Sequence, residues 1–190
     1  MASIIGVETL QHTNGTTAAT IDSSGVVSLT DGSIGKIGTP VSLNGLSETE
    51  YTGLPSDVSA IDVTFSAASF GTANGFIGVQ LGTASGYETS SYYVSNPYMA
   101  TSGSVGHNTN YADFRLYNFG NASNVIYFHM RIMNHGSNNW FASGQGYTEY
   151  GSYYIWLTGY KSLSDTLTKV KIKTATGNFD AGTVNLNYYR

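Results

Sequence analysis

The residues with the chemistry for catalysis or metal binding are few in this chain and are not grouped. The four histidines, His12, His107, His129 and His135, share no metal-ligand spacing with one another or with a carboxylate. The chain has no cysteine, which excludes disulfides, thiolate metal sites and thiol catalysis. No Gly-x-Ser-x-Gly elbow and no phosphate-binding glycine loop before a helix is found. The sequence therefore predicts no catalytic residues, no metal and no cofactor.

The carboxylates give the one arrangement that formally resembles an enzyme. Glu48 and Glu50 lie on one face of an extended segment, as the carboxylate pair of a glycosidase would. They lie in a loop-like lead-in without pocket-forming aromatic residues, so we expect a solvated pair. The aspartates of "DSSG" and "FDAG" are expected in Asx turns, because a calcium site would need more oxygen ligands at fixed spacing. A glycan-degrading enzyme is the remotest alternative.

Tyrosine gives a better indication of binding. Residues 87–111 and 134–154 are predicted as two long polar loops that combine tyrosine with serine, asparagine and glycine, the second with a short strand at residues 140–142. Tyrosine offers a rigid aromatic face with a polar hydroxyl, and aromatic faces stack on the C–H faces of sugars. The predicted glycan-binding residues are Tyr92, Tyr93, Tyr98, His107, Tyr111, Tyr147 and Tyr150. The alternative is that these side chains cover the end of the domain or pack against neighbouring subunits.

The segments between these loops show the two-residue alternation of half-buried β-strands. In "AIDVTFS" and "VIYFHMRIM" the apolar residues alternate with polar or aromatic ones, which places His129 on an outward face. We expect burial of Ile61, Val63, Phe65, Phe128, Met130, Ile132, Val184 and the two tryptophans, Trp140 and Trp156. The lysines of "KVKIKT" are typical of an edge strand. No segment has a sustained helical period.

Composition agrees with a chain of many strands. Glycine is frequent, with 23 residues, and proline is rare, with 3, which suits tight turns between strands. These features predict an all-β protein, an antiparallel β-sandwich of jelly-roll type with an extended N-terminal arm.

The net charge of −4 is too small to indicate a nucleic-acid or membrane-surface partner. The start of the chain has no secretory-signal pattern, so we expect synthesis in a cytoplasm.

The first part of the chain differs from the rest. Residues 1–60 contain one aromatic residue, Tyr51, and the other aromatic residues follow it. We therefore predict two parts, an attachment arm over residues 1–59 with short β segments and a sandwich body over residues 60–190. The arm has too little apolar surface to offset its ordering entropy alone. Its predicted assembly contacts are Ile21, Val26, Val27 and Leu29, which flank the turn signal of residues 22–25.

Several segments resemble a β-sandwich module of tailed-bacteriophage virion proteins, which occurs in tail-fibre-like and other structural proteins, many from marine phages. They are "VSLNGLSETEYTGLPSDVSAIDVTFSAASFG", "IGVQLGTASGYETSSYY", "NNWFASGQG" and "FDAGTVNLNYYR". The opening "LQHTNGTTAATIDSSGVVSL" is similar to an N-terminal element of such proteins. The chain departs from the pattern in tyrosine-rich insertions near residues 92–111 and 147–154.

The resemblance implies a non-enzymatic structural protein on the virion surface, made in the host cytoplasm. Two functions follow as expectations: a fibre-like protein that contacts host-surface glycan through its tyrosine-rich loops, or a capsid decoration protein with purely structural contacts. Expected partners are further copies of the chain in a homotrimer and a capsid or tail protein, with no nucleic acid and no membrane insertion. The resemblance brings no catalytic residues.

Overall fold

A computed structural model gives the structure of the chain. It describes residues 9–11, 17–21, 23–25, 27–29, 35–73, 75–99, 105–106, 111–117, 122, 124–149 and 153–190. Every regular element within these residues is a β-strand. The all-β prediction is therefore confirmed.

The strands are short in the first third of the chain and long in the last. The early strands are β1 (Thr9–Gln11), β2 (Thr17–Ile21), β3 (Val27–Leu29), β4 (Gly35–Lys36), β5 (Val41–Ser42) and β6 (Glu48–Thr52). The middle strands are β7 (Ala60–Phe70), β8 (Phe76–Thr83), β9 (Gly86–Tyr87), β10 (Tyr93–Ser95), β11 (Tyr98–Met99), β12 (Val105–Gly106) and β13 (Phe114–Tyr117). The last strands are β14 (Ile126–Asn134), β15 (Asn139–Thr148), β16 (Tyr153–Ser162), β17 (Lys169–Thr174) and β18 (Phe179–Tyr189).

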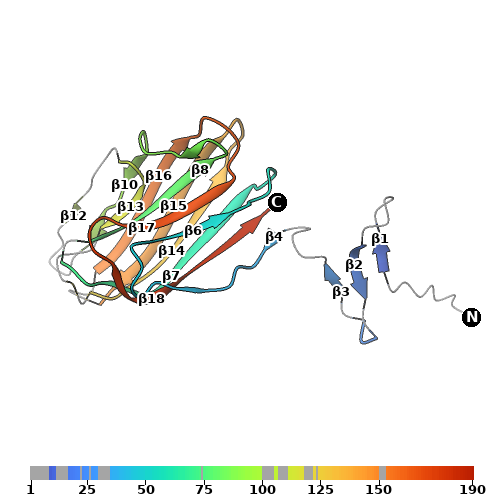
Figure 1. Ribbon diagram of the computed structural model, residues 1–190, viewed down its shortest axis with the longest axis horizontal. Coiled ribbons are helices and arrows are strands. Elements are labelled where there is room, and N and C mark those ends of the chain that lie inside the picture. Colours follow the sequence, from blue (N-terminus) through green and yellow to red (C-terminus); the bar gives the residue numbers. More distant parts are fainter. Residues whose placement is uncertain are drawn as a thin grey trace, which may run out of the picture.

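Two sheets form the sandwich (Figure 1). The large sheet has the order β12-β11-β16-β15-β14-β7-β18-β4, with β10 beside β16 and β5 beside β18. The small sheet has the order β13-β8-β17-β6, with β9 beside β8. All described strand pairs are antiparallel. The predicted antiparallel β-sandwich is thus confirmed, and its jelly-roll connectivity stays a prediction.

The core lies between the two sheets, where the alternating apolar residues meet. The predicted core residues that the structure buries are Ile61, Val63, Phe65, Phe128, Met130, Ile132, Trp140 and Val184. The small sheet faces them with Val79, Leu81, Val170 and Ile172. The prediction for Trp156 is wrong, because its side chain is 37% exposed. Ile155 and Leu157 take the inward positions on β16, so the residue between them points outward.

The composition break near residue 60 does not coincide with the boundary of the sandwich. Strands β4 and β5 pair with β18, and β6 pairs with β17. Leu43, Leu54 and Val58 are buried in the same core as the later strands. Residues 35–59 therefore complete the sandwich, because small and aliphatic residues are sufficient to fill the edges of both sheets.

The described part of the predicted arm forms a third sheet, β1-β2-β3. Its register pairs Ile21 with Val27 and Ala19 with Leu29. Three of the four predicted assembly residues thus lie in β2 and β3, whereas Val26 lies outside the described residues. Their assembly role stays a prediction.

The predicted second loop, residues 134–154, consists mainly of strand. Strand β15 runs from Asn139 to Thr148 and forms hairpins with β14 and β16, so the expected short strand at residues 140–142 is part of a ten-residue strand. In the first predicted loop, residues 87–111, β10 and β11 add to the edge of the large sheet at β16. The large sheet is consequently broader than the sequence indicated.

Strand β17 is an interior strand, contrary to the edge position predicted from its lysines. It pairs with β6 on one side and with β8 on the other. Lys171 lies 3.1 Å from a carboxylate oxygen of Glu48 and 2.9 Å from one of Glu50. Cross-strand ion pairs, rather than exposure at an edge, therefore explain the lysines. Glu48 and Glu50 belong to β6 and are not in a loop-like lead-in.

Candidate functional site

The outward surface of β14, β15 and β16 is rich in aromatic residues. Alternation along each strand turns every second side chain away from the core. The cross-strand register arranges these side chains in four rows, each with one residue from β14, β15 and β16 in that order. The rows are Tyr127–Tyr147–Tyr154, His129–Gln145–Trp156, Arg131–Ser143–Thr158 and Met133–Phe141–Tyr160. We call this surface the outer face.

One end of the outer face is an aromatic cluster. The ring centroids of Tyr147 and Tyr154 are 6.2 Å apart, and those of Tyr154 and Trp156 are 6.4 Å apart with an angle of 28° between the ring planes. Tyr154 is 58% exposed. With Tyr127, these rings line a hollow of about 480 Å³. The cluster therefore presents broad, flat apolar faces to solvent.

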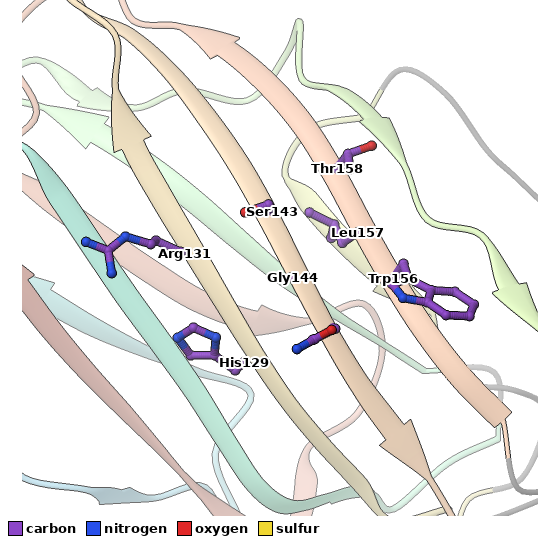
Figure 2. A pocket seen from close by; sticks show the side chains of 8 residues that line it. His129, Arg131, Ser143, Gly144, Trp156, Leu157 and Thr158 are labelled. Carbon is purple, nitrogen blue, oxygen red and sulfur yellow. The ribbon is translucent and has the colours of Figure 1, made fainter.

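A second hollow, of about 390 Å³, occupies the middle two rows. Figure 2 shows His129 and Arg131 extending from β14 over β7, on one side of this hollow. Trp156 and Thr158 of β16 lie on the opposite side, and Ser143 of β15 lies between the two sides. The sheet spacing of about 4.8 Å places β7 and β16 about 14 Å apart. Trp156 and Gln145 line both hollows, so the two form one continuous groove along the outer face.

Six polar side chains of this groove make no hydrogen bond to the described part of the chain. This holds for His129, Arg131, Ser143, Gln145, Trp156 and Thr158. Each has a donor or acceptor that water satisfies and that a ligand can take over. The groove therefore combines exposed aromatic faces with available hydrogen-bonding groups.

Asp62 of β7 lies behind the two basic residues of the groove. Its carboxylate oxygens are 3.4 Å from His129 Nε2 and 3.6 Å from an Arg131 guanidinium nitrogen, and its side chain is 11% exposed. Hydrogen bonding to Asp62 raises the pKa of the Tyr189 hydroxyl. The Arg131 guanidinium also lies 5.1 Å from the centroid of the Tyr189 ring. Asp62 thus supplies a largely buried countercharge, and Arg131 and His129 remain about half exposed.

Two glycines allow the core to pack closely under the groove. A Cβ atom at Gly144 or Gly146 would lie 2.6 Å from an atom of the Phe128 ring. At Gly146 it would also lie 2.2 Å from the carbonyl oxygen of Tyr127. Glycine is thus required on the inward side of β15, and the outward side chains of that strand rest on a rigid base.

The outward surface of the small sheet is chemically different. Lys171 is paired with Glu48 and Glu50, and hydrogen bonding to Lys171 lowers the pKa of Glu50. The buried carboxylate of Asp113 lies 2.9 Å from the Arg115 guanidinium and 3.3 Å from the Lys173 ammonium. These charges satisfy one another, so the outer face of the large sheet is the better candidate for a binding surface.

Tyr92, predicted as a ligand-binding residue, is a core residue. It is fully buried, and burial raises the pKa of its hydroxyl. The hydroxyl accepts a hydrogen bond from the Leu81 N–H at 2.7 Å, and the ring meets Phe114 edge to face at 5.0 Å. A residue fixed in this way cannot contact a ligand.

Two other predicted residues are exposed on the large sheet. Tyr147 lies in the first row of the outer face. Tyr93, on β10, extends the last row, because its ring lies 6.3 Å from that of Tyr160, which in turn lies 5.1 Å from that of Phe141. Tyr93 and Tyr147 are thus at opposite ends of the outer face, not in one loop cluster.

The remaining predicted ligand residues are not brought to the groove by the described structure. Tyr111 is half-buried, bridges to Tyr92, and has the Arg115 guanidinium 4.7 Å from its ring centroid. Tyr98 belongs to β11, but its side chain is outside the described residues. His107 and Tyr150 also lie outside them.

Sequence reasoning missed most of the groove. Gln145, Tyr154 and Trp156 were not among the predicted site residues, because β15 and β16 were assigned to loop or core. Arg131 of β14 was not among them either. The available signal was alternation through "NWFASGQGYT", where Phe141, Ser143, Gln145 and Tyr147 are two residues apart.

No metal or membrane feature accompanies the groove in the part of the chain that the structure describes. No group of three or more histidine, aspartate or glutamate side chains there is arranged to hold a metal ion. No helix there is long and apolar enough to cross a membrane. No protein-family model matches the chain, and no curated protein sequence matches it either.

Proposed function

We propose that the protein is a non-enzymatic saccharide-binding protein of a bacteriophage virion surface, and that the outer face is its binding surface. The observation that supports this most strongly is the composition of the groove. Exposed faces of Tyr154 and Trp156 lie next to the side chains of Gln145, Ser143 and Thr158, which make no hydrogen bond to the described part of the chain.

This combination matches the chemistry of a sugar. A pyranose ring has flat C–H faces surrounded by hydroxyl groups that both donate and accept hydrogen bonds. The C–H faces can stack on Trp156 and Tyr154, and the hydroxyls can bond to Gln145, Ser143 and Thr158. A β-sheet holds these groups in place before binding, which lowers the entropy cost of association.

The length of the outer face suits an oligosaccharide. From Phe141 to Tyr147, β15 rises by about 20 Å at about 3.3 Å per residue. Aromatic rings occur at both ends of this span, and the polar residues lie between them. Several consecutive sugar units can therefore contact the face together.

The virion setting rests on the sequence resemblance. In this proposal the protein is fibre-like, the first part of the chain attaches it to a capsid or tail protein, and the outer face contacts host-surface glycan. The binding surface differs from the one expected from the tyrosine-rich loops, because it is centred on strands.

A glycan array followed by isothermal titration calorimetry tests the proposal. Trp156→Ala should weaken binding of the best array ligand about tenfold, because it removes a stacking face without opening the core. Ile37→Ala is the matched control, since Ile37 is 84% exposed and lies away from the groove. Unchanged affinity in Trp156→Ala would contradict the proposed surface.

A capsid decoration protein with purely structural contacts is the second candidate. It is favoured by the apolar end of the outer face, where Tyr93 is 60% exposed and Met133 and Phe141 are each 42% exposed. Absence of saccharide binding, together with loss of virion incorporation in Phe141→Ser, would support this second function instead.

A further inference from the structure

We propose that the middle of the groove recognises a carboxylate-bearing sugar, with Arg131 and His129 binding the carboxylate and Trp156 stacking on a neighbouring sugar unit. This inference rests on the proposed saccharide binding and names the class of saccharide. It comes from the placement of the two basic side chains, which the general composition of the face does not explain.

Arg131 and His129 are consecutive outward residues of β14. Their side chains are 45% and 50% exposed, respectively. Both extend over β7 on the same side of the groove (Figure 2). A ligand group at this side therefore meets a guanidinium and an imidazole at once.

Arg131 has hydrogen-bonding capacity that other basic residues of the sandwich have already used. Lys161, Lys171 and Lys173 each lie within 3.3 Å of a carboxylate oxygen. The distance from Arg131 to Asp62 is 3.6 Å, beyond that of a hydrogen bond. Its planar fork of N–H groups is thus available to a ligand, and this fork matches the two oxygens of a carboxylate.

The acidic group nearest to Arg131 and His129 does not occupy the ligand's place. Asp62 is largely buried behind them, and the four rows of the outer face contain no aspartate or glutamate. Asp62 balances the charge of Arg131, and the Tyr189 ring supports the guanidinium at 5.1 Å. The charged group that faces the groove is therefore the Arg131 guanidinium, and the Asp62 carboxylate beside it is shielded from solvent.

The geometry also sets the minimum size of the ligand. Arg131 and His129 reach over β7, whereas Trp156 lies on β16, about 14 Å away across the sheet. One sugar ring cannot contact both sides. A carboxylate at Arg131 and a stacked ring at Trp156 thus belong to different units of one chain, with Ser143 and Gln145 beneath the linkage.

The test measures the preference for acidic over neutral oligosaccharides with the full-length protein. Calorimetry at low ionic strength would use tetragalacturonate against its methyl ester, and sialylated lacto-N-tetraose against the uncharged tetrasaccharide. A sulfated galactan tetramer distinguishes carboxylate from sulfate. We expect at least one carboxylated probe to bind about tenfold more tightly than its neutral counterpart, as for hydrogen bonds to a charged group.

The variants link this preference to the groove. Arg131→Gln should reduce the acidic-to-neutral affinity ratio to near one, and Arg131→Lys, which keeps the charge but not the fork, should give an intermediate ratio. Lys169→Gln removes the same charge from the other sheet and should leave the ratio unchanged. Melting curves check folding, and if Arg131→Gln does not fold, Arg131→Lys and the ester comparison decide the question.

The outcomes separate this inference from the proposed function. Equal binding of acidic and neutral probes, a ratio that Arg131→Gln leaves intact, or binding of sulfate without carboxylate would overturn the carboxylate inference while saccharide binding stands. Absence of binding by every probe and every array saccharide would overturn both.

Discussion

At the scale of single residues, Phe128 links the core to the groove. Its ring is 2% exposed and lies against the backbone of Gly144 and Gly146. Phe128→Ala should lower the free energy of unfolding by about 3–5 kcal/mol, because it leaves a cavity where the sheet needs support. Urea denaturation measures this loss.

The neighbouring residue gives the matched control. Tyr127→Ala removes an aromatic ring from the same strand, but this ring is 41% exposed. Its loss should cost less than about 1 kcal/mol. A cost below about 1 kcal/mol for Phe128→Ala as well would mean that the register of β14 is shifted by one residue.

Glu88 and Lys161 form an ion pair whose loss should be visible in the pH dependence of stability. The Glu88 carboxylate lies 3.2 Å from the Lys161 ammonium, which is 4% exposed, and it accepts two hydrogen bonds from Ser164. The Ser164 hydroxyl contributes most to lowering the pKa of Glu88 below its ordinary value of 4.5. Glu88→Gln leaves the ammonium without its partner, at a cost of about 3 kcal/mol at pH 7.

The sign of the pH effect follows from this lowered pKa. The unfolded chain binds the proton of Glu88 at a higher pH than the folded chain does. The stabilisation is therefore complete above pH 4.5 and is lost as the pH falls through the lower pKa of the folded state. Urea denaturation at pH 7 and pH 3 should show a smaller drop in Glu88→Gln than in the wild type. An equal drop in both would contradict the assignment.

Individual side chains were predictable where one alternation pattern was unambiguous. "VIYFHMRIM" places Phe128 inward and His129 outward, and the structure agrees. "SYYIWLTG" consists mostly of apolar and aromatic residues, so composition could not show which alternate set faces the core, and Trp156 was assigned wrongly. Tyr92 resembled a surface tyrosine because its buried hydroxyl partners, the backbone atoms of Leu81, lie on another strand, which residue type alone does not show.

At the scale of elements, residues 35–59 decide whether the sandwich is complete. Leu43 and Leu54 are buried, and β6 covers the edge of the small sheet at β17. A protein that starts at residue 35 should unfold cooperatively with nearly the stability of the full chain. One that starts at residue 56 should be insoluble or lack a cooperative transition, because each lost leucine costs about 2–5 kcal/mol of a total of about 5–15 kcal/mol.

Circular dichroism during heating of the two truncated proteins measures this difference. Cooperative unfolding of the shorter protein, which starts at residue 56, would mean that the composition break near residue 60 is the true boundary. Loss of folding in the longer protein would instead make residues 1–34 part of the folding unit.

Strands were predicted correctly where apolar and polar residues alternate clearly, and wrongly where the prediction relied on residue composition. Long strands with clear alternation, such as β7 and β14, were predictable from sequence. Strand β15 was assigned to a loop because glycine usually marks turns, whereas Gly144 and Gly146 here admit the Phe128 ring. The neighbours of β17 are set by pairing with β6 and β8, which are distant in sequence, so its lysines were misleading.

At the scale of the whole molecule, we predict a homotrimer. The chain has few charges, 11% of its residues, and the small sheet β1-β2-β3 has little apolar surface of its own. Self-association through a symmetric interface stabilises such a segment. The number three comes from the sequence resemblance, because phage fibres are built as trimers. Light scattering should give a mass of about 61 kDa, three times the 20.3 kDa of one chain.

Removal of residues 1–34 locates the interface. The truncated protein should be a monomer if the first part of the chain holds the trimer together. A trimer that survives this truncation would place the interface in the sandwich, and a mass near 20 kDa for the full chain would rule out the trimer itself.

The fold class of the molecule was predictable from glycine turns and strand alternation, but the site was not. Its groove depends on which strands of the large sheet are neighbours, and this information lies in pairings between distant segments. Tyr93 and Tyr147 were predicted from residue type alone, whereas Arg131 becomes a candidate only when Asp62 of β7 is known to lie behind it.

Tryptophan fluorescence tests the central claim, that the outer face binds saccharide, most directly. Trp140 is buried and Trp156 is exposed, so quenching by acrylamide reports on Trp156. Addition of the best saccharide from the array should protect the fluorescence from acrylamide in a saturable manner, and a saccharide that the array shows not to bind should give no protection. Binding that saturates by calorimetry while Trp156 stays fully open to acrylamide would contradict the account.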